Sequence, residues 1–123
     1  MNIAEQAQRA YAPTQMPAQT PRSLEARLFS KVTSMLKRAA TGQIGYAEKV
    51  KALHDNRQMW ATFAANVTDD DNGLPPQLRA QLFYLAEFTE KHSREVLNGT
   101  AEIDALIDIN SAVLRGLNGE GAA

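Results

Sequence analysis

The stretch Ala52-Leu53-His54-Asp55-Asn56-Arg57-Gln58-Met59-Trp60 decides how this chain folds, because it sets polar side chains beside the only tryptophan. Burying an unpaired polar group costs several kcal/mol in an apolar medium, so such groups fix how a helix meets its neighbours. With the amide that interrupts the last apolar stripe, we predict a structural polar hub of Asn56, Arg57, Trp60 and Asn110. Arg57 is expected to pair with Glu25 or Asp108 and to hold the second long helix against the carboxyl-terminal helix.

Apolar residues that recur at three- and four-residue steps predict four long helices. The opening stretch belongs to a helix over about 46–66, and helices over about 21–40 and 76–97 flank it. A fourth helix has its apolar stripe between Ile103 and Leu117. No segment shows the alternating β-branched pattern of a strand. The predicted fold is all-α, a single-domain bundle of these four helices.

The periodicity also predicts which side chains form each stripe. In the first helix the stripe includes Leu24, Leu28, Val32 and Leu36. In the second helix it includes Tyr46, Val50, Leu53, Arg57 and Trp60. We expect these positions to face the neighbouring helices.

The composition divides the chain into an amino-terminal arm, a helical bundle and a carboxyl-terminal tail. Residues 1–20 are predicted to be an amino-terminal arm, either a short helix or extended, because residues 2–10 suit a helix and the following prolines do not. So short a helix is marginal unless it docks, and Tyr11 suits that role. The bundle domain is predicted over 21–118 and a disordered tail over 119–123.

Composition narrows the class of protein. A chain of 123 residues suits one domain, and a net charge of −1 gives no general attraction to nucleic acid or membrane surfaces. There is no cysteine, and no apolar run approaches the ~20 residues that cross a bilayer, so membrane insertion is not expected. The start of the chain lacks the features of a signal peptide. We expect a cytoplasmic protein.

Residues that carry chemistry are sparse. His54 and His92 lie on different predicted helices without the converging carboxylates of a metal site in a bundle. The serines lack a motif that would activate a hydroxyl group, and the acidic loop 69–73 lacks the spacing of a calcium loop. The sequence predicts no catalytic residue, no metal and no cofactor, and therefore not an enzyme.

Aromatic and thioether side chains outside the apolar stripes are the main candidates for binding. These are Met59, Phe63, Phe83, Tyr84 and Phe88. Either the helices pack on three sides with the arm covering the rest, or part of this surface is a groove for another helix. A smaller basic cluster of Lys31, Lys37 and Arg38 is interpreted as a solvated face, with RNA contact as an alternative.

Four stretches, taken in order, carry a family resemblance. They are Arg22–Ala26, Ala52–Trp60, Asn72–Ala80 and Leu106–Asn110, the last followed by Arg115-Gly116-Leu117 and the first preceded by Ala10-Tyr11. Over roughly residues 10–117 the chain resembles the flagellar biosynthesis regulator FlaF family. The order and separation of the motifs, rather than any one of them, make this resemblance specific.

The resemblance implies a cytoplasmic secretion chaperone in bacterial flagellum biogenesis. Such a protein binds the terminal helices of unassembled flagellin and supports flagellin synthesis and export, alongside the regulator FlbT, which is associated with flagellin messenger RNA. The alternative implied function is post-transcriptional control through RNA or through that partner regulator. The resemblance carries over no catalytic residue.

Overall fold

The computed structural model of this protein describes residues 21–67 and 74–117. The predicted arm at 1–20, the acidic loop at 69–73 and the predicted tail at 119–123 lie outside these residues. The described part contains four helices and no strand, which confirms the all-α bundle. They are α2 (Pro21–Ala40), α3 (Tyr46–Val67), α4 (Pro76–Leu97) and α5 (Asp104–Leu117).

Helices α2 and α4 end in the same way, at a glycine in the left-handed conformation. Gly42 has φ +74° and Gly99 has φ +78°, which a residue without a Cβ adopts at little cost. After α4, the Gly99 amide donates to the Val96 carbonyl and the Thr100 amide donates to the Glu95 carbonyl. This pair of hydrogen bonds completes the last turn and redirects the chain toward α5.

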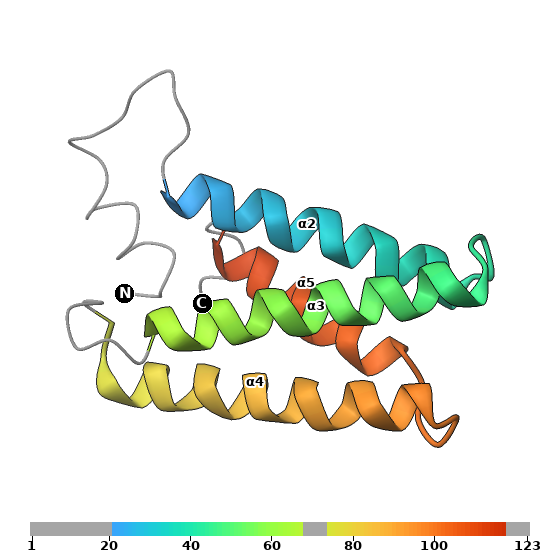
Figure 1. The fold of residues 1–123 in the computed structure, drawn as a ribbon. Coiled ribbons are helices and arrows are strands. Elements are labelled where there is room, and N and C mark those ends of the chain that lie inside the picture. Colours follow the sequence, from blue (N-terminus) through green and yellow to red (C-terminus); the bar gives the residue numbers. More distant parts are fainter. Residues whose placement is uncertain (1–20, 68–73, 118–123) are drawn as a thin grey trace.

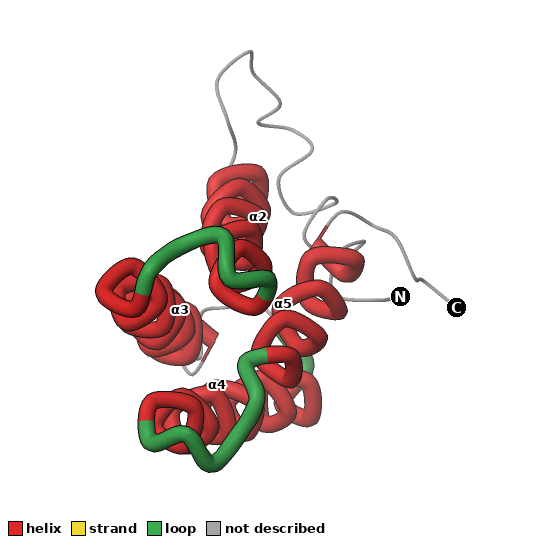
Figure 2. The backbone as a smooth tube through the Cα atoms, turned by 90° about the vertical axis from the view of Figure 1, so that its right-hand side faces the viewer, coloured by secondary structure: helices red, strands yellow, loops and turns green. Residues whose placement is uncertain are grey.

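The four helices run antiparallel to their neighbours in sequence and surround a common core (Figure 1, Figure 2). Helix α3 packs against α2 and α4, and α5 packs mainly against α2, whereas α4 and α5 contact each other only sparingly. Figure 1 shows the reason: α5 crosses the bundle obliquely, from the carboxyl end of α4 toward the amino end of α2. The side of the bundle between α4 and α5 is therefore the least closed.

The core consists of two apolar clusters. The first contains Phe29, Val32, Met59, Trp60, Phe63, Val67, Leu74 and Leu82. The second contains Leu36, Ala52, Leu53, Val96, Ile103 and Leu106. Along each helix a buried polar residue falls between the two clusters, and this polar layer comprises Thr33, Asn56, Thr89, Ser93 and Asn110.

Three aromatic rings form the centre of the first cluster. Phe29 lies 5.5 Å from Trp60 and 5.4 Å from Phe63, measured between ring centroids, and Trp60 lies 5.7 Å from Phe63. All three pairs are edge-to-face, the arrangement that aromatic quadrupoles favour. The cluster joins α2 to α3 in one half of the bundle.

Two predicted stripes are wrong at some positions, whereas Val32, Leu36, Leu53 and Trp60 are buried as predicted. The structure buries Phe29 (1% exposed) instead of Leu28 (48% exposed), and Tyr46 is 69% exposed rather than facing a neighbour. On α3 the centre of the buried face is Asn56, not Arg57. Each helix of this bundle packs against two neighbours, so a wide arc of its surface is buried. Apolar residues at three- and four-residue steps are then compatible with either of two adjacent stripes on that surface. The larger apolar area of Phe29 favours its burial.

Candidate functional site

The polar layer is held by a chain of hydrogen bonds between α3 and α5. The Trp60 Nε1 group donates to Asn110 Oδ1 at 2.8 Å, and Asn110 Nδ2 donates to Asn56 Oδ1 at 2.8 Å. Because an indole nitrogen only donates, it fixes which end of each amide faces which neighbour. The structure thus brings three of the four predicted hub residues together, fully buried. These bonds set the register of α5 on α3.

Arg57, the fourth predicted hub residue, points elsewhere. Its Nη1 atom lies 3.8 Å from Glu90 Oε1, and Arg94 Nε lies 3.5 Å from the same oxygen, all on the partly exposed edge between α3 and α4. The prediction that Arg57 holds α3 against α5 is therefore corrected to α4. Successive helical residues are rotated by about 100°, so with Asn56 facing the core Arg57 is turned toward the next helix.

The five predicted groove residues do not line one groove. Met59 and Phe63 are buried in the first cluster, whereas Phe83 (43% exposed) and Tyr84 (66% exposed) project from α4 into solvent. Phe88 is half-buried and stacks on His92, with 5.2 Å between ring centroids. Their role in binding a partner stays a prediction.

An apolar groove lies where α4 and α5 diverge, with a volume of about 430 Å³. It is lined by Phe63, Leu78, Gln81, Leu82, Leu85, Asp108, Ile109, Ala112, Val113 and Gly116. Phe63 reaches it from α3 on the core side. Only Gln81 and Asp108 bring polar side chains to this groove. Most of its surface is therefore apolar, and removing that surface from water is favourable.

The same side of α4 carries apolar side chains beyond the groove. Tyr84 and Phe88 follow Gln81 by three and seven positions, so they share its side of the helix. At the far end, His92 Nε2 donates to the Glu102 carbonyl at 2.7 Å, which ties α4 to the segment before α5. The α4–α5 groove is therefore closed at the His92 end and widens toward the other end of the bundle.

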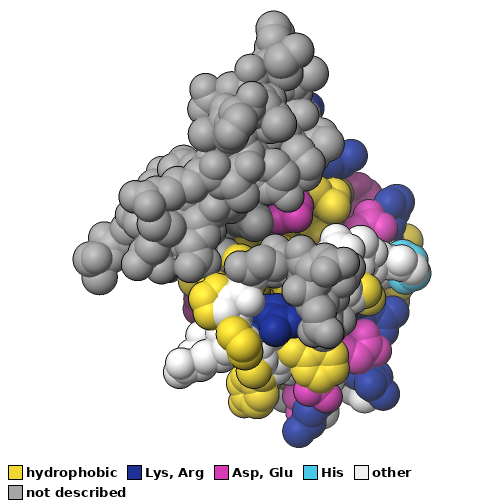
Figure 3. Space-filling model, turned by 90° about the vertical axis from the view of Figure 1, so that its left-hand side faces the viewer, with side chains coloured by type: hydrophobic (Ala, Val, Ile, Leu, Met, Phe, Trp, Pro, Cys, Tyr) yellow, Lys and Arg dark blue, Asp and Glu magenta, His cyan; other side chains and the backbone are white. Residues whose placement is uncertain are grey.

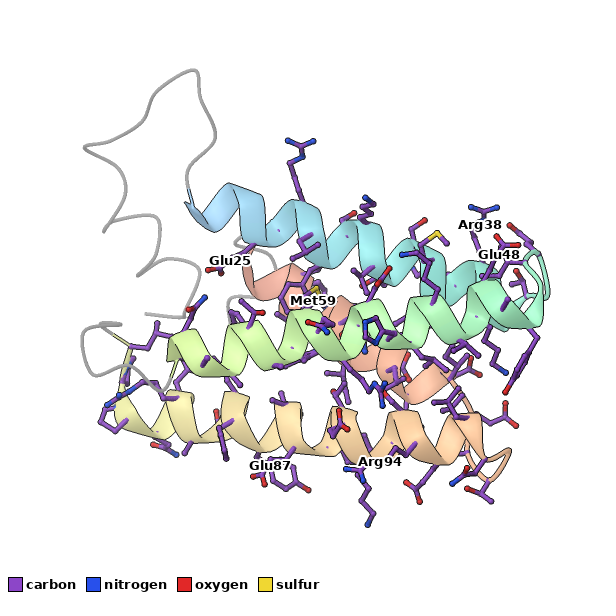
Figure 4. All side chains as sticks on the ribbon, in the orientation of Figure 1. Glu25, Arg38, Glu48, Met59, Glu87 and Arg94 are labelled. Atoms are coloured by element: carbon purple, nitrogen blue, oxygen red, sulfur yellow. The ribbon has the colours of Figure 1, made fainter. Side chains whose placement is uncertain are left out.

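A second groove, of about 330 Å³, lies between α2 and α3. Met59 and Phe63 line it, and Figure 4 shows Met59 between the two helices. Its rim is more polar than that of the α4–α5 groove and includes Glu25, Lys31 and Asp55. An apolar helix face therefore fits the α4–α5 groove better than this one.

Comparison with known families bears directly on this arrangement. The family described as flagellar protein FlaF matches residues 7–117, which include both grooves and the whole polar layer. This chain belongs to the FlaF family. The predicted resemblance is confirmed, and this FlaF protein is a flagellar protein. No curated protein and no solved structure matches the chain.

In this FlaF protein the described residues hold no cluster of three or more histidine, cysteine or acidic side chains suited to a metal ion. His54 lies on the surface of α3, with its Nε2 atom 3.5 Å from Gln58 Nε2. Among residues 21–67 and 74–117, no helix has the length and apolar character to cross a bilayer.

Sequence reasoning missed most residues of the FlaF protein's α4–α5 groove. Leu78, Leu82, Leu85 and Val113 belong to regular apolar stripes, and a stripe alone predicts only burial. The available signal was length: α5 has 14 residues and α4 has 22, so α5 leaves part of the apolar stripe of α4 uncovered.

Proposed function

We propose that this FlaF protein is a cytoplasmic secretion chaperone that binds a terminal helix of unassembled flagellin in the α4–α5 groove. It thereby supports flagellin synthesis and export by binding, not by catalysis. The observation that carries the proposal is the apolar groove between α4 and α5, with Tyr84 exposed beside it. Membership of a flagellar family supports the choice of client.

The dimensions of the groove suit a helical client. Leu78 and Leu85 lie seven residues apart on α4, a rise of about 10 Å, or two helical turns. A client helix inserts anchors at i, i+3 or i+4, and i+7 into such a groove, which covers the same two turns. The family resemblance implies a client whose termini are amphipathic helices. Covering their apolar face would prevent premature polymerisation of flagellin.

The direct test is a titration of fluorescently labelled peptides from both flagellin termini against the full chain. We expect one terminus to bind with a dissociation constant on the order of micromolar, typical of a groove of this size. Failure of every terminal peptide to bind at tens of micromolar contradicts the proposal.

Three tryptophan substitutions at exposed positions locate the site. Ala112→Trp fills the α4–α5 groove, Thr62→Trp fills the α2–α3 groove, and Ala80→Trp lies in neither and is the matched control. We expect Ala112→Trp to weaken peptide binding about tenfold or more and the other two to change it less than about twofold. A loss with Thr62→Trp alone would assign the client to the α2–α3 groove.

A second candidate function is post-transcriptional control, through RNA directly or through the regulator FlbT. The observation that favours it is the charge of α2, which carries Arg22, Arg27, Lys31, Lys37 and Arg38 against one acid, Glu25. Lys31, Lys37 and Arg38 are exposed, and Figure 4 shows Arg38 pointing away from the bundle. Basic side chains on one helix surface are the electrostatic footprint of an RNA contact.

Salt dependence separates the two functions. RNA binding through these side chains releases counterions, so affinity falls steeply with salt and falls further in a variant carrying Lys31→Glu and Arg38→Glu. Peptide binding in the α4–α5 groove is expected to be nearly independent of salt and of those substitutions. The matched control exchanges two charges on other helices, with Lys51→Glu on α3 and Lys91→Glu on α4.

A further inference from the structure

We infer that Asp108 makes the α4–α5 groove specific for a client helix that carries a basic side chain beside its apolar anchors. The inference deepens the proposed function and rests on it for the assignment of this groove to a client helix. It adds the chemistry of that client, which is lysine or arginine next to the anchor at the closed end of the groove. Helices that are equally apolar but neutral or acidic at this position bind less tightly.

The first observation is an unneutralised charge in an apolar site. Within the described part of the chain, Asp108 is the only charged side chain that lines the α4–α5 groove. It is exposed, and in residues 21–67 and 74–117 its carboxylate has no ion-pair or hydrogen-bond partner. Along α5, Asp104 lies about one turn before it and the nearest base, Arg115, lies about two turns after it. The carboxylate is therefore available to a client.

The facing wall of the groove offers no competing charge. Among the described residues, the α4 wall consists of Leu78, Gln81, Leu82 and Leu85. The charged side chains Glu87, Glu90 and Arg94 line the other edge of α4, toward α3. Figure 4 shows Glu87 and Arg94 pointing away from the rest of the bundle. A client base that meets Asp108 thus faces only apolar and amide groups on α4.

Asp108 lies at one end of the groove. Gly116, at the other end, follows it by eight residues on α5, a rise of about 12 Å. The hydrogen bond between His92 and Glu102 closes the bundle at the Asp108 end. Figure 3 looks onto the opposite end, where α4 begins and α5 ends, and shows hydrophobic side chains at the surface. The client therefore places its basic side chain at the closed end and its remaining anchors toward the open end.

The cost of covering a carboxylate explains the specificity. A helix that fills the groove removes water from around Asp108, and a desolvated carboxylate is unfavourable unless an opposite charge pairs with it. Lysine or arginine on the client supplies that charge, whereas glutamate adds repulsion. Specificity of this kind arises from the unfavourable contact with the wrong helix as well as from the favourable contact with the right one.

Designed helical peptides test the inference without relying on flagellin. Three probes share leucine anchors at i, i+4 and i+7. They differ only beside the two terminal anchors, where they carry arginine, glutamine or glutamate, so that either orientation presents one of these residues to Asp108. We expect affinity to fall in that order, by about two- to fivefold at each step, the range of an ion pair at an exposed edge.

Two substitutions of Asp108 locate the preference. Asp108→Asn keeps the size of the side chain and is expected to bring the three affinities within about twofold of one another, whereas Asp108→Lys is expected to reverse their order. The matched control, Glu87→Lys, makes the same change in net charge away from the groove and is expected to leave the order unchanged. Circular dichroism checks that each variant is folded.

Three results overturn the inference. They are failure of all three probes to bind, equal binding of the three by the unaltered protein, and an order that persists in Asp108→Asn.

Salt provides an independent measurement. Raising the salt concentration from about 0.1 M to about 1 M shortens the Debye length from about 10 Å to about 3 Å, so the probes are expected to converge to within about twofold. One ion pair changes affinity far less than the many phosphate contacts of an RNA complex, so salt still separates the two candidate functions. An arginine preference that persists undiminished at high salt contradicts the ionic role of Asp108.

The flagellin peptides keep the inference and the proposed function apart. In a terminal peptide that binds, replacing one lysine or arginine by glutamine is expected to weaken binding about two- to fivefold in the unaltered protein and not in Asp108→Asn. Flagellin binding that no such replacement alters retains the proposed function and rejects the inference. Charge-dependent binding of the probes without flagellin binding retains the specificity of Asp108 and rejects flagellin as the client.

Discussion

Two asparagines of the polar layer are equally buried, yet the structure predicts opposite consequences of replacing them. Asn110 both accepts from Trp60 Nε1 and donates to Asn56 Oδ1, so Asn110→Leu leaves two buried groups without partners. Asn56 only accepts from Asn110, and its own Nδ2 has no hydrogen-bond partner within the described structure. Asn56→Leu therefore removes one unpaired group, its own Nδ2, and creates one, Asn110 Nδ2.

The magnitudes follow from the cost of a buried unpaired donor or acceptor, about 1–3 kcal/mol each. Asn110→Leu is expected to lower the free energy of unfolding by about 2–4 kcal/mol, since part of the cost is offset by new apolar burial. Asn56→Leu is expected to change it by less than about 1 kcal/mol, because the number of unpaired groups is unchanged. Burial alone predicts equal effects at the two positions.

Urea unfolding followed by circular dichroism measures both free energies. The fluorescence of Trp60, the only tryptophan, reports the indole hydrogen bond independently. We expect its emission to shift to shorter wavelength in Asn110→Leu and to remain unchanged in Asn56→Leu. The two positions serve as controls for each other.

Alanine at each position repeats the comparison without the larger volume of leucine. If Asn56→Leu and Asn56→Ala destabilise the protein as much as the matching Asn110 variants, the hydrogen-bond account of the polar layer is refuted.

Three further predictions concern stability and are checked by the same unfolding measurements. Phe29→Ala is expected to lower the free energy of unfolding by about 3–5 kcal/mol, because it leaves a cavity in the aromatic centre of the core. The control Leu28→Ala, at the exposed neighbouring position, should lower it by less than about 1 kcal/mol, and equal effects would support the predicted stripe through Leu28. Arg57→Met is expected to change stability by less than about 1 kcal/mol, since its ion pair is partly exposed, and a loss of several kcal/mol would return Arg57 to the structural hub. Gly99→Ala is expected to cost about 1 kcal/mol through its φ of +78°, because the added Cβ would meet no neighbour within 4 Å and only the backbone conformation opposes it; unchanged stability would contradict this account.

Much of the fold follows from local chemistry along the chain. Prolines at the starts of α2 and α4 and Gly42 and Gly99 after their ends act through the backbone of a few residues, so the predicted helix bounds agree with the structure to within one residue. The family likewise rests on motifs that are readable in order.

The choice between adjacent positions on a helix required the packed bundle. Phe29 rather than Leu28, and Asn56 rather than Arg57, face the core because two neighbouring helices together determine which side is covered. The three- and four-residue spacing of apolar residues in the sequence is compatible with either of the two adjacent positions. The pairing of Arg57 with Glu90 instead of Glu25 or Asp108 has the same cause.

The amino-acid sequence by itself determined the number of helices, their limits, the polar residues available for the core and the flagellar family, because each depends on residues close together in the chain. Tertiary structure alone decided that Trp60, Asn110 and Asn56 form one hydrogen-bonded chain and that an apolar groove opens between α4 and α5. Both depend on the oblique path of α5, which is set by packing between residues fifty or more positions apart. No local pattern in the sequence encodes that crossing.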